Sequence, residues 1–262
     1  MYNVGMVQTK AKSANFTAVT LTNACCAWCD FENADFSDAS MAETILVRIN
    51  FRGANMRNVN FSYSNIISCN FEGASCQNAS FKNIIQDLEV LKRQKPEAFK
   101  EIKLNKSAGL KFSYATLTNT DFSGAKLDNV SFSNAIGANC IFTKSTGRKV
   151  KYDNAIFISS VFNTVRFEGV ILKNTILRNS IFTDSQFKNS IFVKMDFSET
   201  LFTGLSEPCF VGGRMIDVNF SNARGLTAAC FSKIFLKQVD FRGTGIQEIN
   251  FNNDVTIIEC TF

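Results

Sequence analysis

The chain has 262 residues, a formal net charge of +5, 45% hydrophobic and 19% charged residues, and 27 Phe beside one Trp and four Tyr. Histidine is absent, which excludes hydrolases with a histidine base, zinc sites with histidine ligands and histidine acid–base catalysis. A chain of this length can bury one or two hydrophobic cores.

Targeting signals and disulfides are not expected. No apolar run follows a basic segment at the start, and no uncharged apolar stretch reaches the eighteen residues of a membrane helix. Nine cysteines, an odd number at uneven spacing, argue against a secreted disulfide framework. We therefore expect reduced thiols and a cytoplasmic location, or export by a bacterium into a host-cell cytosol.

Residues 1–13 are expected to form an N-terminal cap, with Tyr2, Val4 and Met6 facing inward. From residue 14 to 85, an apolar side chain recurs at every fifth position, and the residue two places earlier is nearly always small or β-branched. The recurring residues are Phe16, Leu21, Cys26, Phe31, Phe36, Met41, Leu46, Phe51, Met56, Phe61, Ile66, Phe71, Cys76 and Phe81. Neither a 3.6-residue helix nor a strand of period two keeps such a pattern on one face. The pattern predicts a first stack of repeats, in a chain that turns a corner every five residues.

Residues 86–107 interrupt the repeat with helix-forming residues and a net positive charge. Apolar residues at Leu88, Leu91, Phe99 and Ile102, with Pro96 placed as in a first helical turn, predict a helical insertion. Two interpretations stay open. The insertion is either an elbow on the side or end of the stack, or a lobe that binds a partner through Lys92, Arg93 and Lys95.

The repeat resumes over residues 108–262 as a second stack with the C-terminal end. Its recurring residues include Phe112, Leu117, Phe122, Leu127, Phe132, Phe142, Tyr152, Phe157, Phe162, Phe167, Leu172, Leu177, Phe182, Phe187, Phe192, Phe197, Phe202, Phe210, Met215, Phe220, Leu226, Phe231, Leu236, Phe241, Ile246 and Phe251. Gly147 interrupts this series next to Lys144, Arg148, Lys149 and Lys151, which form either a solvated bulge or a basic binding site. Pro208 and the following Gly212–Gly213 pair are expected to shift the register.

The recurring residues are predicted to form the core. Representative core side chains are Phe31, Phe51, Phe61, Phe122, Phe162, Phe187, Phe197 and Phe241. Cys26 and Cys29 form a CxxC motif, but both fall on inward positions of the repeat. A tetrahedral zinc site usually needs a second such pair, which the sequence lacks. We therefore expect no metal, no cofactor and no catalytic residues.

The segments ENADFSDASM, RGANMRNVNF, EGASCQNASF and SGAKLDNVSF resemble the pentapeptide repeat family, whose consensus is A(D/N)LXX. The resemblance covers roughly residues 14–85 and 108–254. It implies an all-β fold, a right-handed quadrilateral parallel β-helix with four pentads in each coil. About 42 pentads then give roughly ten coils and a rod about 50 Å long.

Two functions follow from this resemblance. The first is a non-enzymatic scaffold that binds another protein, in the manner of bacterial effectors of the family. Separately from the resemblance, the apolar C-terminal residues without a polar cap predict a homodimer through the C-terminal coil, or a chain that is a piece of a longer protein. The second is a DNA mimic that binds a topoisomerase such as gyrase, as quinolone-resistance members do. A mimic needs an acidic face, whereas residues 1–85, 86–111, 112–204 and 205–262 carry net charges of 0, +3, +3 and −1. Only Asp30, Glu32, Asp35 and Asp38 suggest a local acidic stripe. Nucleic acid is not an expected partner, because the basic segment lacks interleaved aromatic residues.

Overall fold

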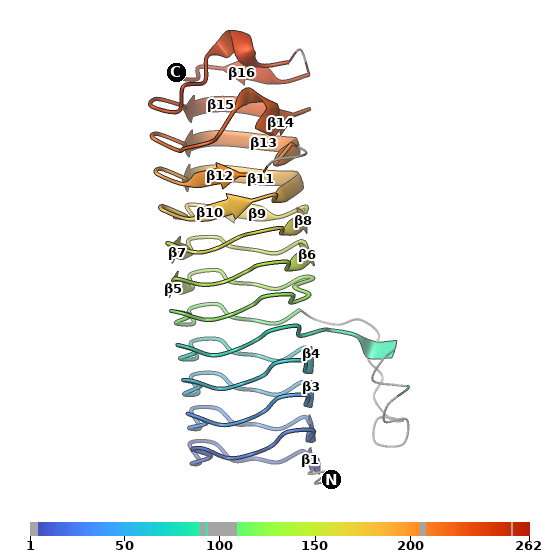
Figure 1. Ribbon diagram of the computed structural model, residues 1–262. Coiled ribbons are helices and arrows are strands. Elements are labelled where there is room, and N and C mark those ends of the chain that lie inside the picture. Colours follow the sequence, from blue (N-terminus) through green and yellow to red (C-terminus); the bar gives the residue numbers. More distant parts are fainter. Residues whose placement is uncertain (1–4, 90–92, 94–108, 205–207, 253) are drawn as a thin grey trace.

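The computed structural model describes residues 5–89, 93, 109–204, 208–252 and 254–262. The chain winds into a straight rod of stacked coils, with the two termini at opposite ends (Figure 1). The strand pairs of the described residues are parallel and join one coil to the next, as in β2 with β3 and β11 with β13. This arrangement is the parallel β-solenoid that the sequence predicts.

The described strands are short except where they turn a corner. They are β1 Gly5–Val7, β2 Cys25–Ala27, β3 Ile45–Val47, β4 Asn65–Ile67, β5 Ile136–Ala138, β6 Thr146–Arg148, β7 Ile156–Ile158, β8 Arg166–Glu168, β9 Ile171–Lys173, β10 Ile181–Thr183, β11 Gln186–Asp196, β12 Leu201–Thr203, β13 Phe210–Asn219, β14 Phe231–Ser232, β15 Phe235–Asp240 and β16 Thr256–Ile258. Two 3-10 turns, η1 Ala228–Cys230 and η2 Glu248–Asn250, lie near the C-terminal end.

The number of coils is larger than predicted. One column of paired backbone positions runs through Lys10, Asp30, Asn50, Asn70, Lys111, Ser131, Lys151, Ile171, Ile191, Arg214, Phe235 and Thr256. The rod therefore has about twelve coils instead of ten. The prediction fell short because it counted only regular pentads, whereas the first residues and the irregular C-terminal segment complete coils of their own.

Each coil has four faces, which we call A to D. The inward residue in the middle of each face is called its centre. Face A has the centres Phe31, Phe51, Phe71, Phe112 and Phe132, and face B has Phe36, Met56, Cys76 and Leu117. Face C has the centres Met41, Phe61, Phe81 and Phe122, and face D has Cys26, Leu46, Ile66 and Leu127. The residues directly before and after a centre point outward, because side chains alternate along extended backbone.

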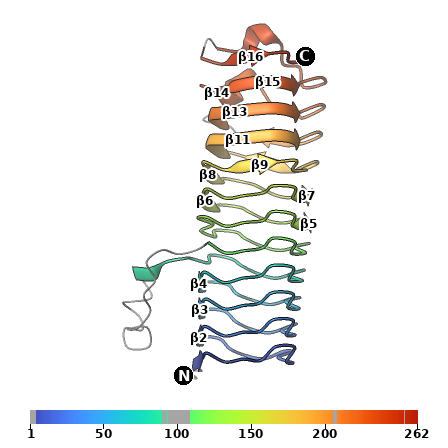
Figure 2. The same cartoon turned by 180° about the vertical axis from the view of Figure 1, so that it is seen from behind.

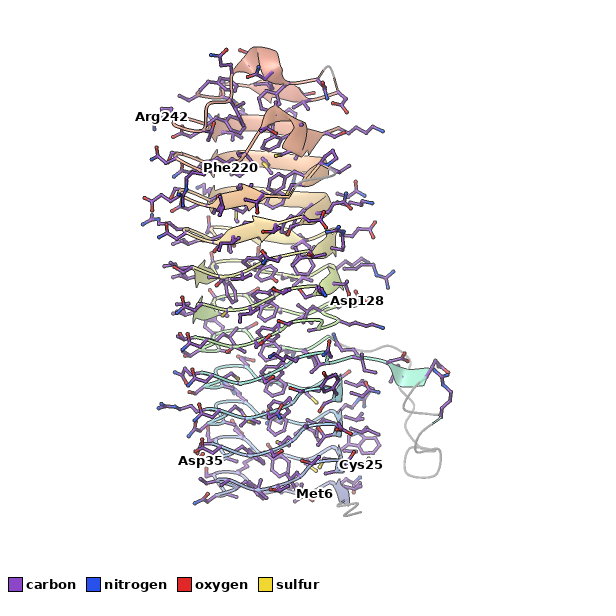
Figure 3. All side chains as sticks on the ribbon, viewed as in Figure 1. Met6, Cys25, Asp35, Asp128, Phe220 and Arg242 are labelled. Atoms are coloured by element: carbon purple, nitrogen blue, oxygen red, sulfur yellow. The ribbon has the colours of Figure 1, made fainter. Side chains whose placement is uncertain are left out.

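The centres fill the axis of the rod (Figure 3). All eight representative phenylalanines are buried, namely Phe31, Phe51, Phe61, Phe122, Phe162, Phe187, Phe197 and Phe241. On face C, the rings stack from coil to coil with centroids 4.8 to 5.2 Å apart, in the order Phe61, Phe81, Phe122, Phe142, Phe162, Phe182 and Phe202. This distance matches the spacing of paired strands, so backbone pairing and ring stacking reinforce each other.

The corners require a left-handed backbone. Outside the two 3-10 turns, the described residue two places after a centre has positive φ, and Asn is the commonest non-glycine residue there, because Asn tolerates this region better than other side chains. On one corner, each Asn side chain donates a hydrogen bond to the side chain one coil earlier, and the series ends on the Asp38 carboxylate. It runs through Asn139, Asn119, Asn78, Asn58 and Asp38.

The chain leaves the regular coils after Ile85 and is paired again at Lys111, without a change in the register of the coils on either side (Figures 1 and 2). Asn70 pairs with Lys111, 41 positions later, whereas most partners are 20 positions apart. Leu88, Glu89 and Arg93 have helical backbone, and Lys92 and Lys95 lie outside the described residues. Leu88 packs on an apolar cluster of outward residues on face D, which includes the buried Ile45, Val47 and Ile67. The described root of the insertion therefore lies against the side of the rod.

The two later breaks differ in their effect. The predicted bulge at Gly147 is wrong, because β6 pairs with β8 at the regular 20-residue spacing and Gly147 is buried as a face-D centre. A Cβ at Gly147 would lie 2.7 Å from Val150 Cγ2, so a neighbouring side chain fills the space. The predicted shift after Pro208 does occur, since Phe187 pairs with Phe210, 23 positions later.

The N-terminal prediction is tested only in part. Met6 packs against the core and β1 pairs with β2. Tyr2 and Val4 lie outside the described residues.

Candidate interaction groove on face D

A groove crosses face D over four consecutive coils. The outward residues before the centres are Lys126, Thr146, Arg166 and Gln186, and those after the centres are Asp128, Arg148, Glu168 and Lys188. These two rows enclose a volume of about 690 Å³ together with Gly147 and Phe167. Figure 3 shows Asp128 on the outside of the rod, at the level just above the insertion.

The register of β6, β8 and β11 aligns these side chains. Thr146 pairs with Arg166, and Arg166 pairs with Gln186. Residues 20 positions apart in sequence therefore stand one above the other, about 4.8 Å apart. Gly147 and Phe167 are centres of the same face, and because centres point into the core they contribute backbone to the floor of the groove.

Two of the four cations in the groove are held by carboxylates. Arg148 Nη2 lies 3.2 Å from Asp128 Oδ2, and the Arg148 backbone N–H donates to Asp128 Oδ1 at 2.8 Å. The hydrogen bond to Asp128 raises the pKa of Arg148. Arg166 Nη2 lies 3.0 Å from Asp184 Oδ2. These pairs are exposed, so each contributes little to stability, but they fix where the guanidinium groups point.

Lys126 and Lys188 stand at the two ends of the groove. Neither has an ion-pair partner among the residues that the structure describes. Three coil spacings separate their backbones, which is about 14 Å. The groove therefore presents two ammonium groups outside any ion pair among the described residues, with the paired guanidinium groups and the Glu168 carboxylate between them.

The four basic residues singled out in the sequence do not form one patch. All of them are exposed. Lys144 occupies the corner before face D and Lys149 the corner after it, since both have positive φ. Arg148 alone lies in the groove, and Lys151 is an outward residue of face A.

Lys126, Arg166 and Lys188 were missed from the sequence. Lys126 and Arg166 are 40 residues apart, and so are Arg148 and Lys188, which places each pair two coils apart in one row of the same face. That offset can be read only once the number of residues in a coil is known.

The root of the insertion adjoins the groove. The Gln86 side-chain amide donates to the backbone oxygens of Lys126 and Asp128, at 3.2 and 3.3 Å. A second depression of about 270 Å³ is lined by Gln86, Asp87, Leu88, Glu89, Lys126 and Asp128. Arg93, the one predicted insertion contact that the structure describes, is exposed and donates from Nε to the Glu89 backbone oxygen at 3.3 Å. Groove and root thus share Lys126 and Asp128.

The CxxC cysteines are part of the core. Cys26 and Cys29 are buried, and the Cys29 thiol donates to the backbone oxygens of Met6 and Ala27. Burial raises the pKa of Cys26 to about 12, so this thiol stays protonated and is a poor metal ligand. Among the described residues, no group of three or more Cys, Asp or Glu side chains is placed to hold a metal ion.

The acidic stripe suggested by the sequence is dispersed. Asp30 and Glu32 both pair with Lys12, at 3.3 and 2.7 Å. Asp35 lies on the next face, where it accepts hydrogen bonds from Ser37, and Asp38 is a corner residue. No helix in the described part of the chain has the length and apolar character to span a membrane.

Comparison with known proteins identifies the repeat. The family model for pentapeptide repeats matches 8 copies, at residues 7–38, 34–73, 109–146 and 165–204. These segments make up more than half of the chain. No curated protein sequence matches.

Three solved structures illustrate the range of similar folds. HetL of the cyanobacterium Nostoc sp. strain PCC 7120, a pentapeptide repeat protein involved in heterocyst differentiation regulation, is 10% identical, with 97% of this chain and 87% of that chain covered and a TM-score of 0.33. Full-length QnrB1, a plasmid-mediated fluoroquinolone resistance protein, is 13% identical, with coverages of 94% and 93% and a TM-score of 0.34. The A-module of the Azotobacter vinelandii mannuronan C-5 epimerase AlgE6 is 9% identical, with coverages of 98% and 78% and a TM-score of 0.30. Such low values transfer no function to this chain.

Proposed function

Because the chain belongs to the pentapeptide repeat family, we propose that it is a non-enzymatic scaffold that binds another protein through the face-D groove. Stacked coils contact only their neighbours and hold outward side chains at a fixed spacing. The observation that supports the proposal is the alignment of Lys126, Arg148, Arg166 and Lys188 over four coils. We place the scaffold in the cytosol of a bacterium, or of a host cell that receives it, because all nine thiols are free.

The groove favours an acidic, extended segment of the partner. Lys126 and Lys188 are about 14 Å apart along the rod. An extended chain rises about 3.3 Å per residue, so two carboxylates four residues apart reach both ammonium groups. The neutralised arginines between them can donate hydrogen bonds to the partner backbone.

The test compares two charge-reversal variants with the unchanged protein. Lys126→Glu together with Lys188→Glu reverses the groove, and Lys111→Glu together with Lys173→Glu makes the same change on face A, where both lysines are exposed. Proteins captured from cells of the source organism are then quantified at 50 and 300 mM salt. We expect a set of proteins that the unchanged chain and the face-A variant retain at low salt, and that the groove variant loses. Equal capture by all three proteins would refute the groove as the interface.

A DNA mimic is the less supported alternative. Such a protein competes for a basic surface and needs an acidic face, whereas Asp30 and Glu32 are paired with Lys12 and the groove on face D carries four cations. We expect neither inhibition nor protection of gyrase in a supercoiling assay. Either effect at micromolar protein would favour the mimic.

Self-association through the last coil is a further proposal. β16 pairs with β15 along one edge, and Ile258 and Phe262 remain 38% and 37% exposed. An uncovered strand edge with apolar neighbours is suited to pairing with a second copy. Sedimentation should then give a dimer mass that Ile258→Asp lowers to the monomer mass, and a monomer at every concentration would exclude the dimer.

A further inference from the structure

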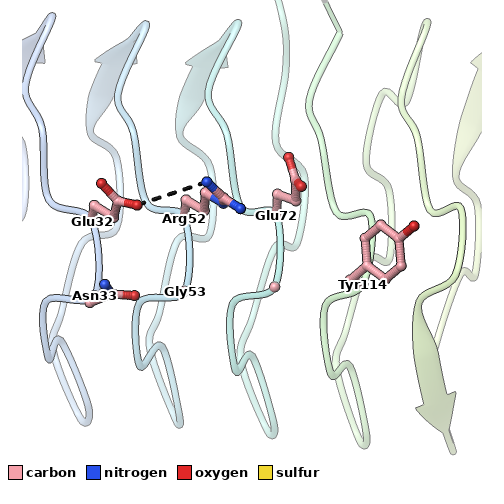
Figure 4. A pocket seen from close by; sticks show the side chains of 7 residues that line it. Glu32, Asn33, Arg52, Gly53, Glu72 and Tyr114 are labelled. Carbon is pink, nitrogen blue, oxygen red and sulfur yellow. Dashed lines mark ion pairs between the residues drawn. The ribbon is translucent and has the colours of Figure 1, made fainter.

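A second concave site lies on the corner that joins faces A and B, away from the groove on face D. Asn33, Gly53, Gly73 and Tyr114 are the corner residues of four successive coils. The preceding side chains Glu32, Arg52 and Glu72 form a row along one side (Figure 4). Together these seven residues line a notch of about 530 Å³, and Tyr114 closes its far end (Figure 4).

The free space in this notch lies at Gly73. A Cβ on Gly53 would lie 2.2 Å from Asn33 Oδ1, so the Asn33 amide already covers that glycine. A Cβ on Gly73 would meet no atom within 4 Å. The open position is therefore the one between the Glu72 side chain and the next corner residue, Tyr114.

The charges around the notch leave Glu72 uncompensated. Lys12 lies 2.7 Å from Glu32, and Arg52 lies 4.0 Å from the other oxygen of Glu32. Glu72 has no ion-pair partner among the described residues. The carboxylate next to the open position thus lies outside any ion pair among the described residues and is half-buried against the rod.

Tyr114 supplies an aromatic surface at the same place. It has φ +60° at a corner where Asn is the commonest residue, and it is 63% exposed. A bulky residue in the left-handed region is uncommon, and burial cannot be the reason for it here. Its ring is available to a ligand that also reaches Glu72.

We propose that this notch binds an arginine side chain of a partner protein. The planar guanidinium stacks on the exposed face of Tyr114, while its N–H groups donate to the Glu72 carboxylate above the bare backbone of Gly73. Arginine suits both contacts, because it is planar, always charged and binds carboxylates through two parallel hydrogen bonds. The proposal goes beyond the groove and stands whether or not the groove binds an acidic segment.

The chain offers a direct spectroscopic test, because it contains only four tyrosines. Replacing them with 3-fluorotyrosine gives four fluorine resonances, which Tyr114→Phe and Tyr63→Phe assign. Tyr63 is the matched control, since it is a corner residue with 66% exposure and no glycine before it in the column. The probe is the tripeptide N-acetyl-Gly-Arg-Gly-amide, titrated at constant ionic strength beside its citrulline analogue, which is neutral but of similar shape.

We expect the arginine peptide to shift the Tyr114 resonance and to leave Tyr63 and the buried Tyr152 unchanged. Glu72→Gln should weaken binding about tenfold, because it removes a charge-assisted pair. Gly73→Asn should weaken it similarly by filling the notch. This variant should fold normally, since Asn is suited to these corners, and a thermal melt verifies that.

Several results would overturn the proposal. They are an equal response of Tyr63, an equal shift with the citrulline peptide, and unchanged binding in either Glu72→Gln or Gly73→Asn. A Tyr114 shift caused by a neutral oligosaccharide such as maltotriose, but not by the arginine peptide, would assign the notch to sugars instead.

Discussion

The buried hydroxyl of Tyr152 allows a sharp test of the packing along the axis. Tyr152 takes the place of a face-A phenylalanine and stacks on Phe132, with centroids 5.1 Å apart and planes 15° apart. It is 2% exposed, and its hydroxyl has no hydrogen-bond partner among the described residues. A buried polar group without a partner costs about 1–3 kcal/mol. Tyr152→Phe keeps the ring and removes that cost. Because the oxygen also leaves a small gap, we expect a net stabilisation of about 1 kcal/mol.

Thermal and urea unfolding measure this effect at pH 7, where a gain of 1 kcal/mol corresponds to about 2–4 °C for a chain of this size. Burial raises the pKa of Tyr152 well above its usual value. The hydroxyl therefore stays protonated in the folded rod and ionises near pH 10 in the unfolded chain. The unchanged protein should lose stability above pH 10 through this group, and Tyr152→Phe should not. The advantage of the variant should therefore grow with pH.

Phe112→Tyr is the control, because it adds the same hydroxyl to the same column where Phe71, Phe81, Phe122 and Phe132 already surround the ring. We expect it to destabilise the rod by about 1–3 kcal/mol. The reasoning fails if Tyr152→Phe is the less stable protein by 1 kcal/mol or more, since the hydroxyl must then make a favourable contact.

Three further outcomes test the register and the burial of the core. Phe187→Ala should cost about 3–5 kcal/mol and Lys188→Ala less than about 0.5 kcal/mol, and equal shifts in a thermal melt would contradict the inward placement of Phe187. Gly147→Ala should cost about 1–3 kcal/mol, because the new Cβ would lie 2.7 Å from Val150 Cγ2, and unfolding as easy as in the unchanged protein would show that the core adapts there. Stability should be fully present below about pH 8.5, the usual thiol pKa, and should fall as the pH rises towards 12. The reason is that burial raises the pKa of three core thiols to about 12, those of Cys26, Cys69 and Cys140. Urea titrations from pH 7 to 10.5 measure that loss, and a flat profile would mean that these thiols are accessible to water.

The fold can be predicted from the sequence because the same two of every five positions face inward. Apolar residues therefore recur at a fixed spacing that can be read directly from the chain. Phe51 and Ala54 show the rule, since one fills the axis, the other is the small residue before the next centre, and both are buried. The bulge predicted at Gly147 was wrong for a reason that no pentad reveals. Val150 occupies the space that a centre side chain would take, so the coil keeps its register without one.

The groove was only partly predictable. Arg148 attracted attention because it lies in a local run of cations, whereas Lys126 and Lys188 are isolated in the sequence. Their common face depends on the 20-residue coil, because Lys126 and Lys188 are three coils and two positions apart and stand on either side of the face-D centres. Charged residues that are neighbours in the sequence are easily noticed. A solenoid, however, brings together residues that are one or more coils apart in the sequence, and these are not noticed in the same way.

The same geometry explains why outward residues can change without affecting the rod. In the column of face-D residues that precede the centres, Ile45 belongs to a buried apolar cluster at the root of the insertion, while Lys126 and Arg166 line a charged groove. The backbone pairing continues through both regions, because the hydrogen bonds between coils do not depend on the outward side chain. A binding surface on this protein is therefore specified by which residues share a column, and a single insertion of the wrong length within a coil would separate residues such as Glu72 and Tyr114 that now stand on neighbouring coils.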